Sequence, residues 1–532
     1  MNVLLIKHPT THFSGTSPAV SGMPLGLLYV AASLKKAGHT VRIYDAIVEA
    51  DESRWGYSVS GGIYQMGATW KEFKAVVDKL RPDVVGIANQ YSSQVMNTLK
   101  AAEAIKELSK DIKVIVGGAH PSVRPEDFFR ENNYVDYVVM GEGEATATEL
   151  LESLEGKKDI KTVKGIAYIS NGELVVHEKR GLIENIDSLP LPAYELLDLE
   201  RYFYFNEKGR DSRENYRYPG SERSVSMITS RGCPFNCIFC SVHLGMGKKF
   251  RAHSAQSVLG HIGFLKEKYR INHIHFEDDN ISLDTLRFNK ILNCIIENNF
   301  DITWDTPNGL RADYLNEELL RKCRASGCTY LRIGVESANR HVNKEIIKKD
   351  LDIDKITEVS KACERIGIDL EAFYIIGFPG ENIAQMKETI NFALRQEGLY
   401  GLYPYNIFTA TPLIGTDLYK ICRQKGYLSK DISPENLATA TQGEGLILTE
   451  DFSPTDLKKL LKQFRLRHYI AMLAYFIKFI ISHPQYMFLR FKNRLVIKEA
   501  CGHFFRFQAI SFLEAIFGFR YKNCVINKVG IE

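Results

Sequence analysis

Residues Ser230–Cys240 read SRGCPFNCIFC, and the cysteines within this stretch are spaced C-x3-C-x2-C. A four-iron iron–sulfur cluster takes thiolate ligands on its irons. Cys233, Cys237 and Cys240 can hold three irons and leave the fourth iron open, so that a substrate or cofactor can chelate it. The alternatives are a zinc knuckle or three buried thiols. A structural zinc site normally takes four protein ligands, often as two separated pairs. The sequence has no such second pair, so the stretch favours the cluster.

The cysteine run resembles the signature of the radical S-adenosylmethionine (radical SAM) enzymes. The spacing agrees, the aromatic Phe239 precedes the third cysteine, and the strand-like segment Ser224–Thr229 leads into the run. In that family the amino and carboxylate groups of SAM chelate the open iron. An electron from the cluster then breaks a carbon–sulfur bond and releases a 5′-deoxyadenosyl radical. The resemblance implies a [4Fe-4S] cluster on the three cysteines and a SAM contact at Phe239.

The bulk composition is that of a globular protein. The chain has 532 residues, enough for about three domains. Its hydrophobic content of 45% and charged content of 25% are ordinary. Met1 leads directly into the strand-like Asn2–Ile6 without a basic start or a small-residue cleavage site, so we expect no signal peptide and a cytoplasmic location. A reducing cytosol argues against disulfides. The cysteines outside the run show no metal spacing and are expected to be small buried hydrophobes: Cys294, Cys323, Cys328, Cys363, Cys422, Cys501 and Cys524.

Residues 1–155 predict a doubly wound, Rossmann-like α/β domain. Short apolar runs alternate with helical patterns, which indicates βαβ units and a parallel sheet. The expected strands are Asn2–Lys7, Thr40–Asp45, Asp83–Ala88, Lys113–Gly117 and Val135–Met140. The expected helices are Leu25–Ala37, Trp70–Leu80 and Val95–Leu108, with a short turn near Pro125–Arg130. Glycines follow the fourth and fifth strands, at the edge where open α/β sheets bind ligands.

These motifs are similar to the cobalamin-binding domain that precedes the radical SAM domain in one large subfamily. The segments that carry the resemblance are Pro24–Ala32, Pro82–Ile87, Val116–Pro121 and Val139–Glu144. It implies cobalamin contacts at eight residues of these segments: Gly26, Leu27, Gly117, Gly118, His120, Gly141, Glu142 and Gly143. The alternative is an unrelated flavodoxin-like domain, because a five-strand α/β pattern is common. The chain has no Asp-x-His-x-x-Gly motif, so no histidine of that motif can ligate cobalt from below.

A connector and a second βα series follow. Residues 156–222 are expected to be a connector, with a hairpin turning at Asn171-Gly172 and a Pro-rich crossing at Leu189–Tyr194. Residues 223–425 contain six expected strands: Val225–Thr229, His273–Glu277, Ile302–Thr306, Tyr330–Val335, Leu370–Ile376 and Tyr405–Ala410. Helical patterns lie between them, such as Ile356–Arg365 and Met386–Leu394. Six such units agree with the partial (βα)6 barrel of radical SAM enzymes, whose chemistry would lie at the carboxyl ends of the strands.

Polar residues at these strand ends are candidates for holding SAM. Phe276–Asn280 ends the second strand, and either Asp278 or Asp279 can accept hydrogen bonds from the ammonium group of SAM. The two aspartates are not distinguished by the sequence. The alternative is a solvated acidic turn that caps the next helix.

Further candidates follow the later strands. Arg311 suits a bidentate clamp on a carboxylate or, equally, a structural salt bridge. Glu336 and Ser337 end the fourth strand. Glu336 suits the ribose hydroxyls of SAM, and Ser337 suits the ribose or the carboxylate. Gly377 opens the turn Gly377–Glu381, which resembles the glycine-rich adenine-side turn of the family, although a tight turn alone also requires glycine.

The cysteine distribution narrows the reaction that the resemblance implies. Residues 1–232 contain no cysteine, so the second N-terminal cluster of methylthiotransferases is absent. The resemblance then implies cobalamin-dependent methylation of an unactivated carbon, or of phosphorus, on a small-molecule or lipid substrate, with an external electron donor of flavodoxin or ferredoxin type. The alternatives are an oxidative cyclase of the anaerobic Mg-protoporphyrin type and a non-catalytic cobalamin or iron–sulfur binding module. The full set of strand-end residues argues against the last.

The C-terminal region, residues 426–532, is expected to be helical and basic. Residues 457–532 carry fourteen Lys/Arg and three Asp/Glu, a net +11, whereas the preceding 456 residues carry 54 and 61, a net −7. The apolar stretch Tyr469–Ile481 contains Lys478 and is shorter than the ~20 apolar residues of a bilayer span. Two predictions stay open: a helix lying on the anionic inner face of a membrane, or a helical cap over the barrel mouth. The apolar content disfavours a nucleic-acid surface.

Overall fold

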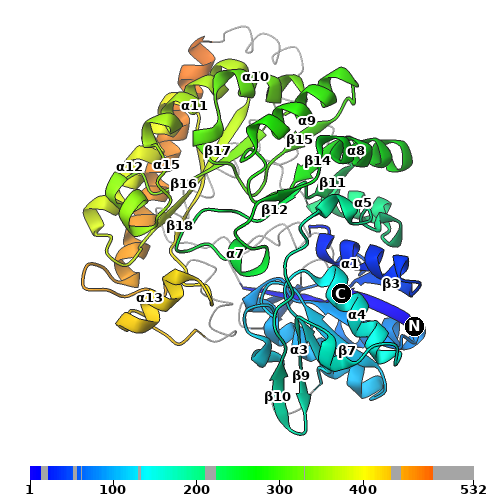
Figure 1. Ribbon diagram of the computed structural model, residues 1–532. Helices are drawn as coiled ribbons and strands as arrows, with labels where there is room; N and C mark the ends of the chain where they lie inside the picture. The colour runs from blue at the N-terminus through cyan, green and yellow to red at the C-terminus, as the bar shows by residue number, and fades with distance from the viewer. Residues whose placement is uncertain are drawn as a thin grey trace, which may run out of the picture.

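The structure of the protein is a computed structural model. It describes residues 1–13, 22–51, 57–60, 63–129, 134–209, 223–328, 330–432 and 445–482. Figure 1 shows an N-terminal α/β unit, a larger unit of parallel strands wrapped by helices, and a long helix along the outside of the larger unit.

The N-terminal unit is built on a seven-stranded sheet with the order β10-β9-β8-β7-β6-β1-β3. Five of its strands are parallel: β1 (Asn2–Lys7), β3 (Thr40–Asp45), β6 (Val84–Ala88), β7 (Lys113–Gly117) and β8 (Tyr137–Val139). They confirm the five strands expected from the sequence, with β8 shorter than expected. Their apolar residues run almost without interruption because helices cover both faces of the sheet.

Helices pack on both faces of this sheet. α1 (Leu25–Lys36) packs with α4 (Gly143–Leu154) on one face, and α2 (Trp70–Leu80) packs with α3 (Val95–Leu108) on the other. α2 begins at a reciprocal capping box between Thr69 and Glu72. The apolar core beneath α1 and α4 continues into the core of the larger unit. The two units therefore share one core on this side.

The predicted hairpin belongs to the same sheet. β9 (Ile166–Ser170) and β10 (Glu173–Val176) pair antiparallel, and β9 pairs with the edge of β8. Asn171 and Gly172 both have positive φ, as a two-residue hairpin turn requires. A small antiparallel sheet of β2 (Thr10–Phe13), β5 (Ile63–Met66) and β4 (Tyr57–Ser60) was not expected, because its four-residue strands are too short for a period to be read.

The larger unit contains six parallel strands in two hydrogen-bonded groups. The groups are β11 (Ser224–Met227), β14 (His273–Phe276) and β15 (Thr303–Asp305), then β16 (Tyr330–Glu336), β17 (Asp369–Ile376) and β18 (Tyr403–Thr409). Single parallel bridges from Trp304 to Cys328 and from Leu310 to Ile333 join them. We call this open arc of strands the barrel. Each strand end lies within two residues of its predicted position.

Helices form the outer layer of the barrel (Figure 1). They are α8 (Ala255–Tyr269), α9 (Thr285–Glu297), α10 (Glu317–Ala325), α11 (Ile353–Ile366) and α12 (Ile383–Tyr400), with α13 (Asp417–Lys425) below. Alternate strand residues such as Ile274 and Phe276 join the apolar core beneath these helices. Their neighbours along the strand face the barrel interior. Cys323, Cys328, Cys363 and Cys422 are buried as predicted and Cys294 is half-buried, whereas Cys501 and Cys524 lie outside the described residues.

α15 (Pro454–Ser482) lies along the outside of α12 (Figure 1). Leu457 and Phe464 are buried, and the His468 ring is 2.8 Å from a carboxylate oxygen of Glu397. This part of the C-terminal region follows the barrel wall, and residues 483–532 lie outside the described residues. Among the helices in the described ranges, none is both long and apolar enough to cross a membrane.

Candidate active site

The three cysteines lie on a loop at the carboxyl end of β11. A short strand, β12 (Ser230–Arg231), pairs with β13 (Arg251–Ala252) and holds the start of this loop. Gly232 has φ +84°, and a Cβ there would lie 2.4 Å from the Lys249 carbonyl oxygen, so only glycine fits. All three thiols are half-buried, and burial raises the pKa of each, that of Cys240 to about 12. Neighbouring thiolates would repel one another, so a cationic ligand is needed to hold all three.

Asp278 and Asp279 follow β14 and have different partners. Asp278 is buried and accepts hydrogen bonds from the Thr229 amide (3.1 Å), the Thr229 hydroxyl (2.7 Å) and the Ser230 hydroxyl. Asp279 accepts one hydrogen bond, from the Gly232 amide at 3.3 Å. Burial and the nearby Asp278 raise the pKa of Asp279 to about 6. Asp278 therefore anchors the loop from behind, while Asp279 lies beside the first cysteine with acceptor capacity left.

Glu336 sits in a strained position at the end of β16. Its φ is +62°, a left-handed conformation that is uncommon outside glycine, and the register of β16 shifts here. Its carboxylate pairs with Lys349 at 2.9 Å, and both side chains are buried. A Cβ on Gly334 would lie 2.7 Å from both partners, so Gly334 makes room for the pair. The ammonium of Lys349 lowers the pKa of Cys233 and Cys237 against the larger effect of burial, which places it near the thiols.

The other predicted SAM contacts already have protein partners. Arg311 donates to Asp313 (2.6 Å) and to the Lys349 carbonyl (2.9 Å) and stacks on Phe235 of the cysteine loop at 3.9 Å. These contacts agree with the alternative prediction for Arg311, a structural salt bridge. The hydroxyl of Ser337 lies 3.1 Å from that of Thr389 on α12. The SAM roles of Arg311 and Ser337 stay predictions.

The turn at Gly377 is organised by Glu381. The Glu381 carboxylate accepts hydrogen bonds from the Gly377 amide (2.7 Å) and the Phe378 amide (3.1 Å). Burial raises the pKa of Glu381 to about 7, although these hydrogen bonds oppose the rise. Phe378 packs against Phe239 with 5.8 Å between ring centroids. The turn and the cysteine loop are thus in contact.

The glycines expected to contact cobalamin lie at the carboxyl edge of the N-terminal sheet. Gly118 has φ +126°, and a Cβ there would lie 2.3 Å from the Asn89 carbonyl oxygen. A Cβ on Gly141, or on Gly26 at the start of α1, would meet nothing within 4 Å. A Cβ on Gly117 would stay 3.7 Å from its nearest neighbour, whereas one on Gly143 would crowd Val30 at 3.2 Å, and Leu27 is buried in the core. This glycine-lined edge fits a bulky planar ligand.

His120 is buried and held on both sides. One ring nitrogen lies 2.8 Å from the Ser92 hydroxyl and the other 2.9 Å from the Asp127 carboxylate. Both ring nitrogens therefore have partners within the N-terminal unit. The predicted contact between His120 and cobalamin stays a prediction. It would be made by the ring carbons of His120, because both ring nitrogens have protein partners.

Ion pairs join the two units directly beside the cysteine loop. Arg231 pairs with Glu142 (2.9 Å) and Glu144 (2.7 Å), and Arg251 pairs with Glu142 (2.7 Å). Burial opposes ionisation of Glu142, yet hydrogen bonds from Ile183, Arg231 and Arg251 lower its pKa overall. We call Glu142, Glu144, Arg231 and Arg251 the interdomain ion cluster. It ties the Gly141–Glu144 turn to the residue two positions before Cys233.

Both families that the arrangement suggests match the chain. The B12 binding domain matches residues 13–151, and the Radical SAM superfamily matches residues 227–393. The protein is a cobalamin-dependent radical SAM enzyme. Its cofactors are a [4Fe-4S] cluster, SAM and cobalamin, and an enzyme of this kind acts on a substrate and needs a reductant.

Relatives cover most of this radical SAM enzyme. An uncharacterized methyltransferase of Pyrococcus horikoshii is 29% identical over 490 residues, which cover 92% of this chain and 97% of that protein. The cytidylyl-2-hydroxyethylphosphonate methyltransferase of Streptomyces wedmorensis is 28% identical over 472 residues, covering 84% and 85%. The structure of the cobalamin-dependent S-adenosylmethionine radical enzyme OxsB, with aqua-cobalamin and SAM bound, has a TM-score of 0.63 at 16% identity, covering 91% of this chain and 75% of that one. This last likeness shows the shared fold.

Sequence reasoning missed several residues of the site. Lys349 lies in no motif, and only the folded structure shows that it pairs with Glu336. Arg231 precedes the cysteine run and looks like an ordinary basic residue until the N-terminal unit supplies its partners. The one available signal was the pair of glutamates in Gly141–Glu144, which are acidic residues next to a glycine turn.

Proposed function

We propose that this enzyme methylates an unactivated carbon, or a phosphorus, of a small-molecule or lipid substrate. The observation that carries the proposal is the interdomain ion cluster, which holds the glycine-lined edge against the start of the cysteine loop. A substrate that contacts both the glycine-lined edge and the cysteine loop can react with groups bound at either place. When bound, the iron–sulfur cluster, SAM and cobalamin supply hydrogen abstraction and a transferable methyl group. The protein supplies orientation and a defined distance between the two sites.

On the barrel side, Cys233, Cys237 and Cys240 would hold the cluster. Asp279 is the aspartate that we assign to the ammonium group of SAM, because Asp278 is already engaged by Thr229 and Ser230. Glu336 would accept from the ribose hydroxyls, oriented by its pair with Lys349.

On the cobalamin side, Gly117 and Gly141 would let the corrin ring approach the backbone, whereas the Cβ position of Gly118 is already filled by the Asn89 backbone. Glu142 and Glu144 are engaged by arginines, so we assign them to holding the turn. His120 is held by Ser92 and Asp127, which is consistent with a cobalamin without an imidazole from this residue on cobalt.

The relatives favour methyl transfer over oxidation. The two sequence relatives described above carry methyltransferase in their names, and both match over most of their length. An oxidative cyclase of the Mg-protoporphyrin type remains the second candidate, because it would use the same cofactors. The external reductant would be a one-electron protein of flavodoxin or ferredoxin type.

Anaerobic reconstitution tests the proposal. The enzyme would be incubated with cobalamin, SAM carrying a deuterated methyl group, a reductant and fractionated cell extract, and the products analysed by mass spectrometry. We expect a product that gains the deuterated methyl, absent with Cys237→Ala. Cys294→Ala, which changes a half-buried cysteine outside the loop, should keep activity. A product that has lost two hydrogens and gained no label would overturn methylation in favour of oxidation.

A further inference from the structure

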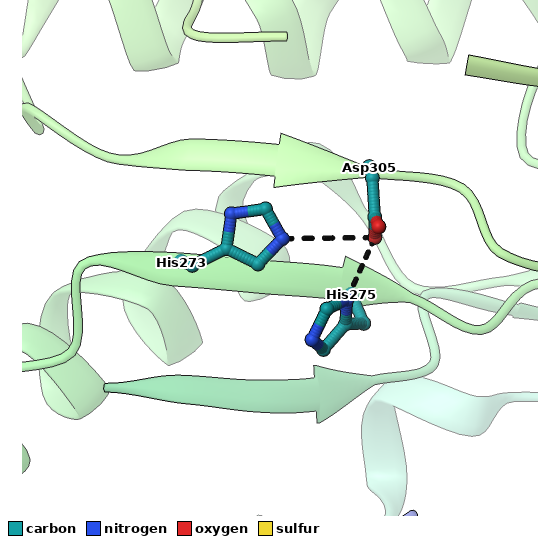
Figure 2. A group of neighbouring side chains, drawn as sticks. All are labelled: His273, His275 and Asp305. Carbon is teal, nitrogen blue, oxygen red and sulfur yellow. Dashed lines mark hydrogen bonds and ion pairs between the residues drawn. The ribbon is translucent and has the colours of Figure 1, made fainter. Parts of the chain in front are cut away.

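Three chemistry-bearing side chains from β14 and β15 meet inside the barrel. His273 and His275 are two residues apart on β14, so both project to the same side of the strand. Asp305 lies on the neighbouring strand β15, in register with His275, while Thr303 is in register with His273. The alternate residues Ile274 and Phe276 belong to the apolar core on the other side. Figure 2 shows the two imidazoles and the carboxylate converging.

The ligand atoms are close enough to share one ion. The Nδ1 atom of His275 lies 2.8 Å from an oxygen of Asp305, and the Nε2 atom of His273 lies 3.8 Å from the same oxygen. One donor atom from each of the three residues lies within 4.8 Å of the others. Donor atoms bound tetrahedrally at about 2.0–2.2 Å lie about 3.3–3.6 Å apart. Binding would therefore open the 2.8 Å pair by about half an ångström and close the widest separation by about 1 Å or a little more.

The surroundings orient the His273 ring. Its Nδ1 lies 2.7 Å from the Thr303 hydroxyl, and that hydroxyl in turn donates to the Asn272 carbonyl at 3.3 Å. With Nδ1 beside Thr303, the other ring nitrogen of His273, Nε2, is the one that faces Asp305. Outer partners of this kind are typical of histidines that bind metals.

Burial leaves one side of the triad open. The side chains of His273 and Asp305 are 0% and 4% exposed, whereas that of His275 is 27% exposed. Two imidazoles and one carboxylate with an open position are the ligand set of divalent transition metals, zinc and iron among them. The triad and the cysteine loop come from different elements, because the triad lies on β14 and β15 and the loop follows β11.

We propose that His273, His275 and Asp305 bind one divalent transition-metal ion, with zinc as the expected ion, inside the barrel. This ion is additional to the iron of the cluster. It would tie β14 to β15 and leave one coordination position for water or a polar group of the substrate.

Metal analysis of the holoenzyme tests the site. The reconstituted enzyme should contain about one zinc per chain beyond its cluster iron, and His275→Ala should lose the zinc while keeping the iron, sulfide and brown colour. His341→Ala, which removes an exposed histidine on another element, should keep both. Zinc that is absent from the wild type after incubation with zinc and gel filtration, or that survives His275→Ala, overturns the proposal and leaves a hydrogen-bonded histidine–aspartate group.

A second background guards against metal held by cysteine. In a full-length chain with Cys233, Cys237 and Cys240 all changed to Ala, one equivalent of cobalt(II) should bind. Its visible absorption spectrum should be that of nitrogen and oxygen ligands, without a thiolate charge-transfer band. Thr303→Val keeps all three ligands and should weaken this binding about 10- to 100-fold. Circular dichroism confirms that each variant is folded. Cobalt binding that is unchanged in Thr303→Val and lost in no histidine variant would also overturn the site.

Discussion

At the residue scale, the site depends on a few side chains whose backbone or environment is unfavourable by itself. Glu336 has a left-handed backbone and Glu381 is a carboxyl group with almost no solvent contact. Such positions persist only where surrounding contacts impose them, and they concentrate at functional sites. Both residues lie at strand ends of the barrel, next to the cysteine loop.

Replacing Glu336 should separate SAM binding from cluster binding. If Glu336 binds the ribose as proposed, Glu336→Ala would remove one charge-assisted hydrogen bond, so SAM affinity should fall by about 1.5–3 kcal/mol, while iron and sulfide content stay unchanged. Equilibrium dialysis with labelled SAM measures the affinity. Glu345→Ala, an exposed glutamate nearby, should bind SAM as the wild type does. An unchanged dissociation constant for Glu336→Ala would give Glu336 a purely structural role.

Glu381 should make stability depend on pH. Burial raises its pKa to about 7 from an ordinary value of 4.5, so the folded state favours the protonated acid. This contribution is fully present below the unfolded pKa and is lost as pH rises through the folded pKa. The thermal midpoint should therefore fall between about pH 4.5 and pH 7, and Glu381→Gln, which cannot ionise, should show a smaller fall. Equal slopes for the two proteins, measured by differential scanning fluorimetry, would contradict the assignment.

At the element scale, α15 has two faces with different expectations. Leu457, Leu460 and Phe464 are buried toward α12. Phe464→Ala should cost about 3 kcal/mol, seen as a lower thermal midpoint and faster proteolysis within residues 454–482. Ile470→Ala changes a side chain that is 64% exposed and should stay within about 0.5 kcal/mol. Equal effects of the two substitutions would mean that α15 does not dock as described.

The outward face of α15 suits an anionic membrane surface. Leu466, Ile470, Ile477 and Ile481 are exposed and fall on one side of the helix at 100° per residue. Basic residues stand on the same helix, so an apolar stripe with cationic neighbours is presented outward. We expect the enzyme to co-sediment with acidic liposomes at low salt, and Ile470→Glu combined with Ile477→Glu to abolish this. Absence of binding by the wild type would remove the membrane prediction.

At the scale of the whole molecule, the interdomain ion cluster sets how the two units meet. Arg231→Met keeps the bulk of the side chain but leaves Glu142 and Glu144 without this partner in a buried site, which should cost about 3–5 kcal/mol. Lys249→Ala breaks an exposed pair with Glu184 and should cost about 1 kcal/mol or less. The thermal midpoint and proteolysis between the two units measure the difference. Similar small effects of both substitutions would show that the apolar core alone holds the units together.

The sequence by itself determined the elements and the cysteine site. Strands such as Lys113–Gly117 and helices such as Trp70–Leu80 agree with their observed bounds, because apolar periodicity and caps are local properties of the chain. The C-x3-C-x2-C run needed no tertiary information either, since its three thiols lie on one loop.

Only the tertiary structure decided which distant residues meet. It joined the predicted hairpin to the N-terminal sheet, gave Asp278 and Asp279 different hydrogen-bond partners, and paired Arg231 with Glu142 and Glu144. It also brought Asp305 beside His275 through the register of two parallel strands. The physical reason is that strand register and ion pairing depend on how separate elements pack. The residue pattern within one element does not specify which residue of another element it will contact.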